Sequence, residues 1–168
     1  FRYKEQTIQQ AMLQKLARVI SGLRSAALLL ENGFLQDQSA IHRILDEFHE
    51  DILFLAYAVI NNDQIETHQK YLDVFYKEQF DHQTGEWLPN VKPVSRREIR
   101  NYLAKATHAG MDSGDGSSQS KQIYSLYSGF VHGNSPHIMD MVQGNPPKFR
   151  LHGMTGTQLH KLHQDDLY

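Results

Sequence analysis

The chain has 168 residues, of which 40% are hydrophobic and 21% are charged, and its formal net charge is −2. This composition excludes wholesale disorder, and the nearly neutral balance gives no overall electrostatic attraction for nucleic acid. The chain has no cysteine, which excludes disulfides, thiolate zinc sites and a cysteine nucleophile.

The sequence also limits location and domain count. No apolar run approaches the roughly 20 residues of a membrane helix, and the N-terminus lacks the basic-then-apolar layout of a signal peptide. We therefore expect a cytoplasmic protein with no membrane partner. The length fits a single helical-bundle domain, residues 1–168, and the last residues lie in a segment that looks unfinished, so we expect truncation at the C-terminal end.

Apolar residues recur every three or four positions early in the chain and predict a long helix over residues 4–31. The stripe expected to face the core is Ile8, Met12, Leu16, Ile20, Leu23, Ala27 and Leu30. Asn32-Gly33 ends this helix, and Ser39 is expected to cap a second one over residues 39–61. The second half of that helix is apolar nearly all round, which is typical of the central helix of a bundle.

Further helices follow from capping and breaking residues. Asp63 is expected to cap a third helix that ends near Phe80, and Ser95 with Glu98 forms a capping box that opens a fourth over 95–106. Residues 110–118 are rich in Gly, Ser and Asp and predict a mobile loop.

The C-terminal part continues the helical pattern. We predict helices over residues 120–132 and 136–142, a short extended piece over 149–152, and a last helix capped by Thr157. Five or six helices with short connections and no internal repeat predict an all-α helical bundle.

The helix predicted over 120–132 carries the first candidate site. Tyr124, Ser128 and His132 recur at every fourth position, so they share one face of that helix, and Asn134 follows at the turn. A row of two hydroxyls and an imidazole beside an apolar face is suited to a buried polar network or to a small acid–base site. Alternatively, His132 only stabilises the end of the helix.

The second candidate group lies on the predicted central helix. Arg43 and Glu47, with Glu50, are expected on the side opposite its apolar stripe, although that side becomes apolar one to two turns later. The pair therefore has two interpretations: an ordinary helix pair worth a few tenths of a kcal/mol, or part of a pocket that includes His132 or Tyr124.

Two other groups of polar residues could bind a metal ion or nucleic acid. His42, Asp46 and His49 have a spacing that places ligands along a helix, but no second copy of such a motif exists, so we expect no metal and no cofactor. Arg96, Arg97 and Arg100 form the main basic concentration, which suggests either contact with RNA phosphates or a solvated, salt-bridged surface.

Two stretches resemble a family of bacterial helical domains of unknown function. They are Arg43-Ile44-Leu45-Asp46-Glu47 running into Ile52-Leu53-Phe54-Leu55-Ala56-Tyr57, and Tyr124-Ser125-Leu126-Tyr127-Ser128-Gly129-Phe130-Val131-His132-Gly133. That family is similar in outline to the HEPN superfamily, whose bundles often act as ribonucleases through an Arg-x4–6-His motif. This sequence departs from the motif, because no arginine stands in the required window before His132.

Three functional readings follow. The favoured one is a helical domain that binds a partner or small ligand, with homodimerisation through the long first helix as one form of it. The alternative implied by the resemblance is a HEPN-like ribonuclease of a toxin or defence system, using His132 with Arg43 and Glu47, in which Arg96, Arg97 and Arg100 guide RNA. A metal-dependent bundle enzyme comes third.

Overall fold

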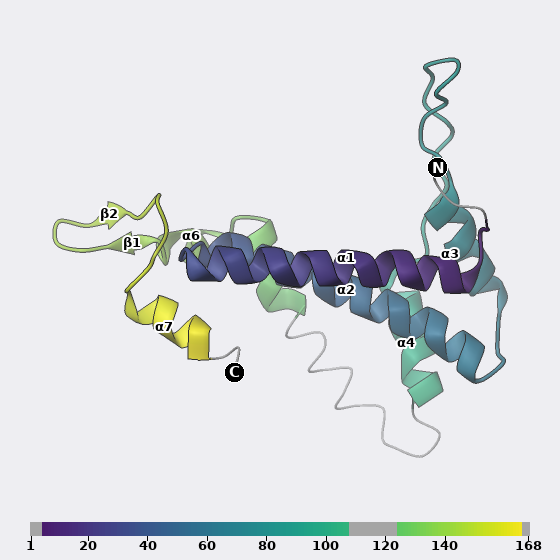
Figure 1. Ribbon diagram of the computed structural model, residues 1–168, viewed down its shortest axis with the longest axis horizontal. Helices are drawn as coiled ribbons and strands as arrows, with labels where there is room; N and C mark the ends of the chain where they lie inside the picture. The colour runs from purple at the N-terminus through teal and green to yellow at the C-terminus, as the bar shows by residue number, and fades with distance from the viewer. Residues whose placement is uncertain (1–4, 108–123, 166–168) are drawn as a thin grey trace. The chain divides into compact units, whose positions relative to one another are not determined.

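The computed structural model describes residues 5–107 and 124–165, and these are predominantly helical (Figure 1). The helices are α1 (Ile8–Glu31), α2 (Leu35–Ile60), α3 (Glu66–Tyr76), α4 (Arg96–Thr107), α6 (Ser135–Met139) and α7 (Gln158–Asp165), and residues 124–131 are also helical. Strands β1 (Val142–Gln143) and β2 (Lys148–Phe149) form a small antiparallel pair in which Val142 faces Phe149. The predicted all-α helical-bundle class is confirmed.

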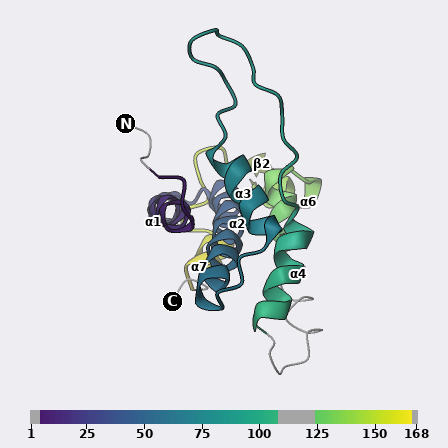
Figure 2. The same cartoon turned by 90° about the vertical axis from the view of Figure 1, so that its right-hand side faces the viewer.

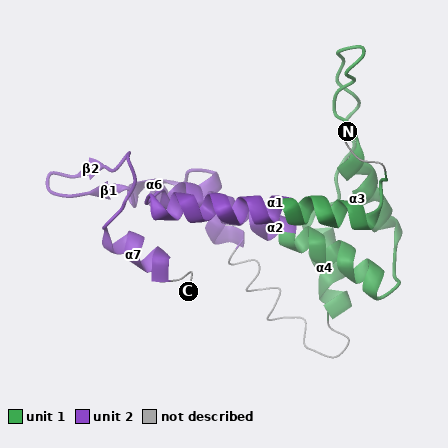
Figure 3. Cartoon of the chain, viewed as in Figure 1, with its two compact units in different colours: residues 1–17, 49–113 green, residues 18–48, 114–168 purple. Residues whose placement is uncertain are grey.

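The chain divides into two compact units, coloured separately in Figure 3. Unit 1 contains Phe1–Ala17 and His49–Ser113, and unit 2 contains Arg18–Phe48 and Gly114–Tyr168. The single domain expected from the length stays a prediction.

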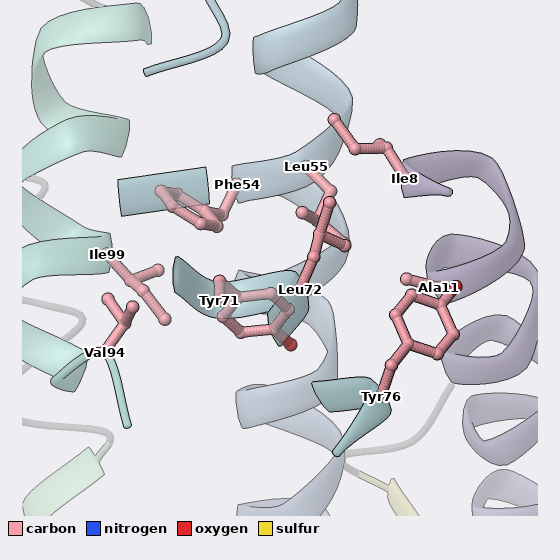
Figure 4. Packing of buried hydrophobic residues seen from close by; sticks show 9 residues of the cluster. All are labelled: Ile8, Ala11, Phe54, Leu55, Tyr71, Leu72, Tyr76, Val94 and Ile99. Atoms are coloured by element: carbon pink, nitrogen blue, oxygen red, sulfur yellow. The ribbon is translucent and has the colours of Figure 1, made fainter. Parts of the chain in front are cut away.

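The core of unit 1 gathers side chains from four helices. Phe54 and Leu55 of α2 are fully buried, and so is Ile99 of α4. Figure 4 shows Phe54, Tyr71 and Leu72 lying between Ile99 and Val94 on one side and Ile8 and Ala11 on the other. The segment that joins α3 to α4 extends away from both helices in the views of Figure 1 and Figure 2.

The core of unit 2 forms around the turn between α1 and α2. Leu30, Leu35 and Met154 are its buried apolar residues. The backbone N–H of Met154 donates to the carbonyl of Gly33 over 2.8 Å, and the imidazole Nε2 of His160 lies 2.7 Å from the carbonyl of Leu30. The segment before α7 is therefore held against the end of α1.

Two predicted caps are confirmed. The Ser95 hydroxyl accepts from the N–H of Glu98 while the Glu98 carboxylate accepts from the N–H of Ser95, which is the predicted capping box. The Thr157 hydroxyl accepts from the N–H of His160 at the start of α7. The extended piece expected near 149–152 is strand β2, which lies slightly earlier in the chain.

Two other caps were predicted wrongly. Helix α2 begins at Leu35, because the N–H of Phe34 closes the end of α1 on the carbonyl of Leu29 and the next turn starts at once; Ser39 is consequently buried inside the helix. Helix α3 begins at Glu66, where the N–H of Ile65 donates to Nδ1 of His68, so Asp63 is not its cap.

The predicted end of α3 near Phe80 is also wrong. The helix stops at Tyr76, since the backbone of Lys77 is extended, and Phe80 instead forms a β-bridge with Trp87. The mobile loop predicted over 110–118 lies outside the described residues, as does the beginning of the helix predicted over 120–132.

The core face predicted for α1 is wrong at its centre. Leu16, Ile20 and Leu23 are 47%, 48% and 51% exposed. Small residues take their place: Ala26 is buried, and a Cβ added to Gly22 would lie 2.5 Å from the Leu45 side chain of α2. Small residues allow two helix backbones to approach closely, and the larger residues then fall on another face.

The face predicted for α2 is wrong at Arg43. We expected Arg43 on the outer side and Ile44 in the core, but Arg43 is 7% exposed and Ile44 is 44% exposed. The reason is that the guanidinium of Arg43 packs on an aromatic ring.

Candidate binding site around Arg43

Arg43 is the centre of a polar cluster in unit 2. Its guanidinium carbon lies 3.6 Å from the centroid of the Tyr124 ring, and its Nη2 lies 2.6 Å from Oε1 of Glu47. The separation of four residues places Arg43 and Glu47 on the same face of α2. The contact with the Tyr124 ring face is a cation–π interaction, which gains strength when the cation is removed from water.

The Nη1 group of Arg43 is buried and has no hydrogen-bond acceptor among residues 5–107 and 124–165. The Glu47 side chain is 37% exposed, so water screens the charge that it offers to Arg43. A buried guanidinium is stabilised only when its remaining donors are also satisfied, and an unmet buried donor costs about 1–3 kcal/mol. An acceptor from outside the described residues would remove this cost.

A second aromatic contact joins the same two segments. The ring centroids of His42 and Tyr127 lie 5.9 Å apart with an interplanar angle of 16°. Burial lowers the pKa of His42 below its ordinary value, opposed by the nearby carboxylate of Asp46. His42 is thereby favoured in its neutral, stacking form at neutral pH.

The other members of the predicted row lie further along the 124–131 helix. Ser128 is half-buried, and both His132 and Asn134 are exposed. His132 follows Tyr124 by eight residues, which is about 12 Å along the axis of a helix. The structure thus brings Arg43, Glu47 and Tyr124 together and places His132 at the far end of the row.

Gly129 sets the close packing of the next turn. A Cβ at this position would lie 2.3 Å from Nε2 of His137, and the His137 ring packs against Phe130 at 4.0 Å between centroids. The backbone N–H of Asn134 donates to the carbonyl of Gly129 over 2.9 Å. These contacts hold α6 against the helix that carries Tyr124.

The basic residues of α4 belong to unit 1, where two of them are held by acids of α2. Arg96 lies 2.6 Å from Asp51, and Nε of Arg100 lies 2.6 Å from Glu50. Arg97 is exposed. Of the three arginines considered for RNA, Arg96 and Arg100 therefore have part of their charge neutralised by neighbouring carboxylates.

Sequence reasoning missed the centre of this ion-pair cluster. Asp51 is 2% exposed and also binds Lys15 of α1 at 2.7 Å. The Lys15 ammonium lies 5.1 Å from the centroid of the Phe75 ring. One signal in the sequence pointed to it: Asp51 directly precedes the apolar run Ile52-Leu53-Phe54. A carboxylate on a buried turn of a helix needs a cationic partner, because an unpaired buried charge is costly.

The described residues give no metal site and no membrane helix. Across residues 5–107 and 124–165, no three acids or histidines are grouped so as to hold a metal ion. None of the helices in those ranges combines the length and apolar character needed to cross a membrane.

Comparison of the chain with protein families, with curated proteins and with solved structures found no match. The resemblance to HEPN-like bacterial domains therefore stays a prediction.

Proposed function

We propose that this chain is a helical-bundle domain that binds a partner or small ligand at the Arg43 site rather than catalysing a known reaction. The observation that carries the proposal is the buried Nη1 of Arg43, which has no acceptor in the described part of the chain while Nη2 is held by Glu47. Native proteins rarely leave such a donor unmet, and a bound group that supplies the acceptor would account for it.

The surroundings of Arg43 define what the site accepts. A guanidinium donates to oxygen acceptors and binds carboxylate or phosphate most strongly, because those hydrogen bonds are charge-assisted. Tyr124 already holds the guanidinium plane in place, so little side-chain entropy remains to be lost on binding. The proposed ligand or partner thus presents an oxygen acceptor to Nη1.

Calorimetry with a mixed panel of carboxylates, phosphate esters and neutral amides tests the proposal. We expect at least one class to bind, and Arg43→Gln to weaken its binding about tenfold or more. Arg43→Lys, which retains the charge but loses the fork of donors, should bind weakly while remaining folded by circular dichroism. The matched control is Arg24→Gln, because Arg24 is exposed on α1 of the same unit. Equal binding by Arg43→Gln and the native chain would overturn the proposal.

The HEPN-like ribonuclease is the second candidate, supported by the exposure of His132 to solvent. A nuclease predicts that the native chain cleaves single-stranded RNA and that His132→Ala abolishes cleavage with little change in melting temperature. Our binding proposal predicts no cleavage by either protein. RNA guidance by Arg96 and Arg100 has weaker support, since Asp51 and Glu50 hold those side chains.

A further inference from the structure

A cavity lies in unit 1 beside the end of α3. Its volume is about 340 Å³, which falls within the range of roughly 300–1,000 Å³ that is typical of small-molecule sites. One wall is the last turn of α3 with the residues just after it, and the other is formed by residues 87–91. Those residues belong to the segment between α3 and α4 that Figure 2 shows extending away from the helices. The whole cavity is therefore built by one stretch of one unit.

Hydrogen bonds hold the two walls of the cavity together. The ammonium of Lys77 donates to the carbonyl of Pro89 over 2.5 Å, which joins the end of α3 to the opposite wall. The backbone N–H of Leu88 donates to the carbonyl of Gln79 over 3.0 Å. A site whose walls are fixed before the ligand arrives loses less conformational entropy on binding.

Trp87 presents an aromatic surface at this cavity. It is one of the lining residues and is 77% exposed. Its position is set by Phe80, with which it forms a β-bridge, and the two ring centroids lie 5.6 Å apart at an interplanar angle of 71°. A single exposed apolar residue is ordinary, but an indole that lines a cavity is a surface on which a flat ligand can stack.

The other lining residues favour an uncharged ligand with a polar edge. Lys77 and Glu78 carry opposite charges, so the lining has no net charge with which to attract an ion. Gln79 and Asn90 are exposed, and each of their amides supplies donors and an acceptor. The remaining lining residues are apolar: Val74, Leu88, Pro89 and Val91. A sugar would place hydroxyls against these apolar groups, whereas a heteroaromatic ring has apolar faces and keeps its polar groups at its edge.

We propose that this cavity binds a small, uncharged heteroaromatic ring, such as the base of a free nucleoside, stacked on Trp87. The amides of Gln79 and Asn90 bind its edge, because an amide matches the adjacent donor and acceptor of a nucleobase. A base within a nucleic-acid strand suits the cavity less, since grooves that bind strands combine stacking with positive charge, and this lining has no net charge. The site is distinct from that of Arg43, which belongs to unit 2.

Fluorescence titration of the whole chain with adenosine and with uridine tests the proposal, because Trp87 is the only tryptophan. We expect saturable quenching of the indole emission by at least one nucleoside, whereas random collision gives quenching that does not saturate. Tetramethylammonium, maltose and a single-stranded hexanucleotide are the comparison ligands. No saturation by about 10 mM of either nucleoside would refute the proposal. Tighter binding of the ammonium ion, of the sugar or of the strand would also overturn it.

Calorimetry on variants locates the binding. Trp87→Ala should weaken nucleoside binding about tenfold, and Trp87→Phe, which keeps an aromatic ring, should lose less. Asn90→Ala should also weaken binding, and it leaves the contacts of the Trp87 ring in place should Trp87→Ala fail to fold by circular dichroism. The matched control is Phe149→Ala, because Phe149 is an aromatic residue of unit 2 that is 52% exposed. Arg43→Gln should bind nucleosides as the native chain does, which separates this site from the one proposed above. Native affinity in both Trp87→Ala and Asn90→Ala, or equal weakening in Phe149→Ala, would place the ligand elsewhere.

Discussion

His68 lies in a more restricted environment than an exposed histidine. It is fully buried, its ring stacks on Phe54 with 4.1 Å between centroids, and the edge of Tyr102 lies 4.5 Å away. Nδ1 accepts a hydrogen bond from the N–H of Ile65, which requires that this nitrogen carry no proton. Burial lowers the pKa of His68, opposed by the carbonyl of Phe54 and the charge of Asp63.

This shift predicts that the free energy of unfolding decreases as the pH falls below about 6.5, the ordinary value for histidine. In that range the unfolded chain takes up a proton at His68 and the folded chain does not, so acid favours unfolding. Each such proton contributes at most about 1.4 kcal/mol per pH unit. Above that range the contribution of His68 is constant.

Urea titrations at pH 7.5, 6.5 and 5.5 measure this dependence. His68→Gln should be less stable at pH 7.5 but show a shallower loss on acidification. His42 contributes in the same direction, because burial lowers its pKa too, so part of the slope remains in the variant. His152→Gln, at an exposed position, should leave the slope unchanged. An unaltered slope in His68→Gln would contradict the assignment.

At the scale of the helices, Asp51 joins α1, α2 and α4 within unit 1. Its carboxylate binds both Lys15 and Arg96. Asp51→Asn leaves those two cations near a buried neutral amide, so we expect a loss of about 3–5 kcal/mol in the free energy of unfolding. Asp73→Asn, on the exposed side of α3, should cost less than about 0.5 kcal/mol. Chemical denaturation of both variants tests this. Equal losses in the free energy of unfolding would show that the ion pairs of Asp51 do not stabilise the packing of α1, α2 and α4.

The turn between α1 and α2 gives a second prediction at this scale. Gly33 has φ +74°, and a Cβ there would lie 2.4 Å from the backbone nitrogen of Thr155. Gly85 has nearly the same φ, +77°, but a Cβ there would meet nothing within 4 Å. Alanine at Gly85 should therefore cost about 1–2 kcal/mol from backbone conformation alone.

Gly33→Ala adds a backbone clash to that conformational cost and should be clearly more destabilising than Gly85→Ala in thermal melts. Similar decreases in melting temperature for the two variants would mean that the segment before α7 does not pack closely against Gly33. A decrease for Gly33→Ala alone would indicate that the turn at Gly85 tolerates alanine.

The sequence by itself determined the properties that depend on local spacing. Apolar periodicity identified the helices and the all-α class, and the pattern Ser-x-x-Glu at Ser95 fixed one helix start, because a capping box needs only residues of one turn. The same reasoning placed Arg43, Glu47 and Tyr124 among the candidate site residues. It failed at Ser39 and Asp63, where Gly33 and His68 shaped the helix starts instead.

Only the tertiary structure decided which faces are buried and which polar groups meet. Leu16, Ile20 and Leu23 satisfy the core periodicity, but the smaller Ala26 and Gly22 allow α1 and α2 to approach more closely, and the large residues remain exposed. Arg43 is buried because an aromatic ring about eighty positions later packs on it. Periodicity reports that a helix has an apolar face, whereas the identity of the neighbour depends on contacts between residues far apart in the chain.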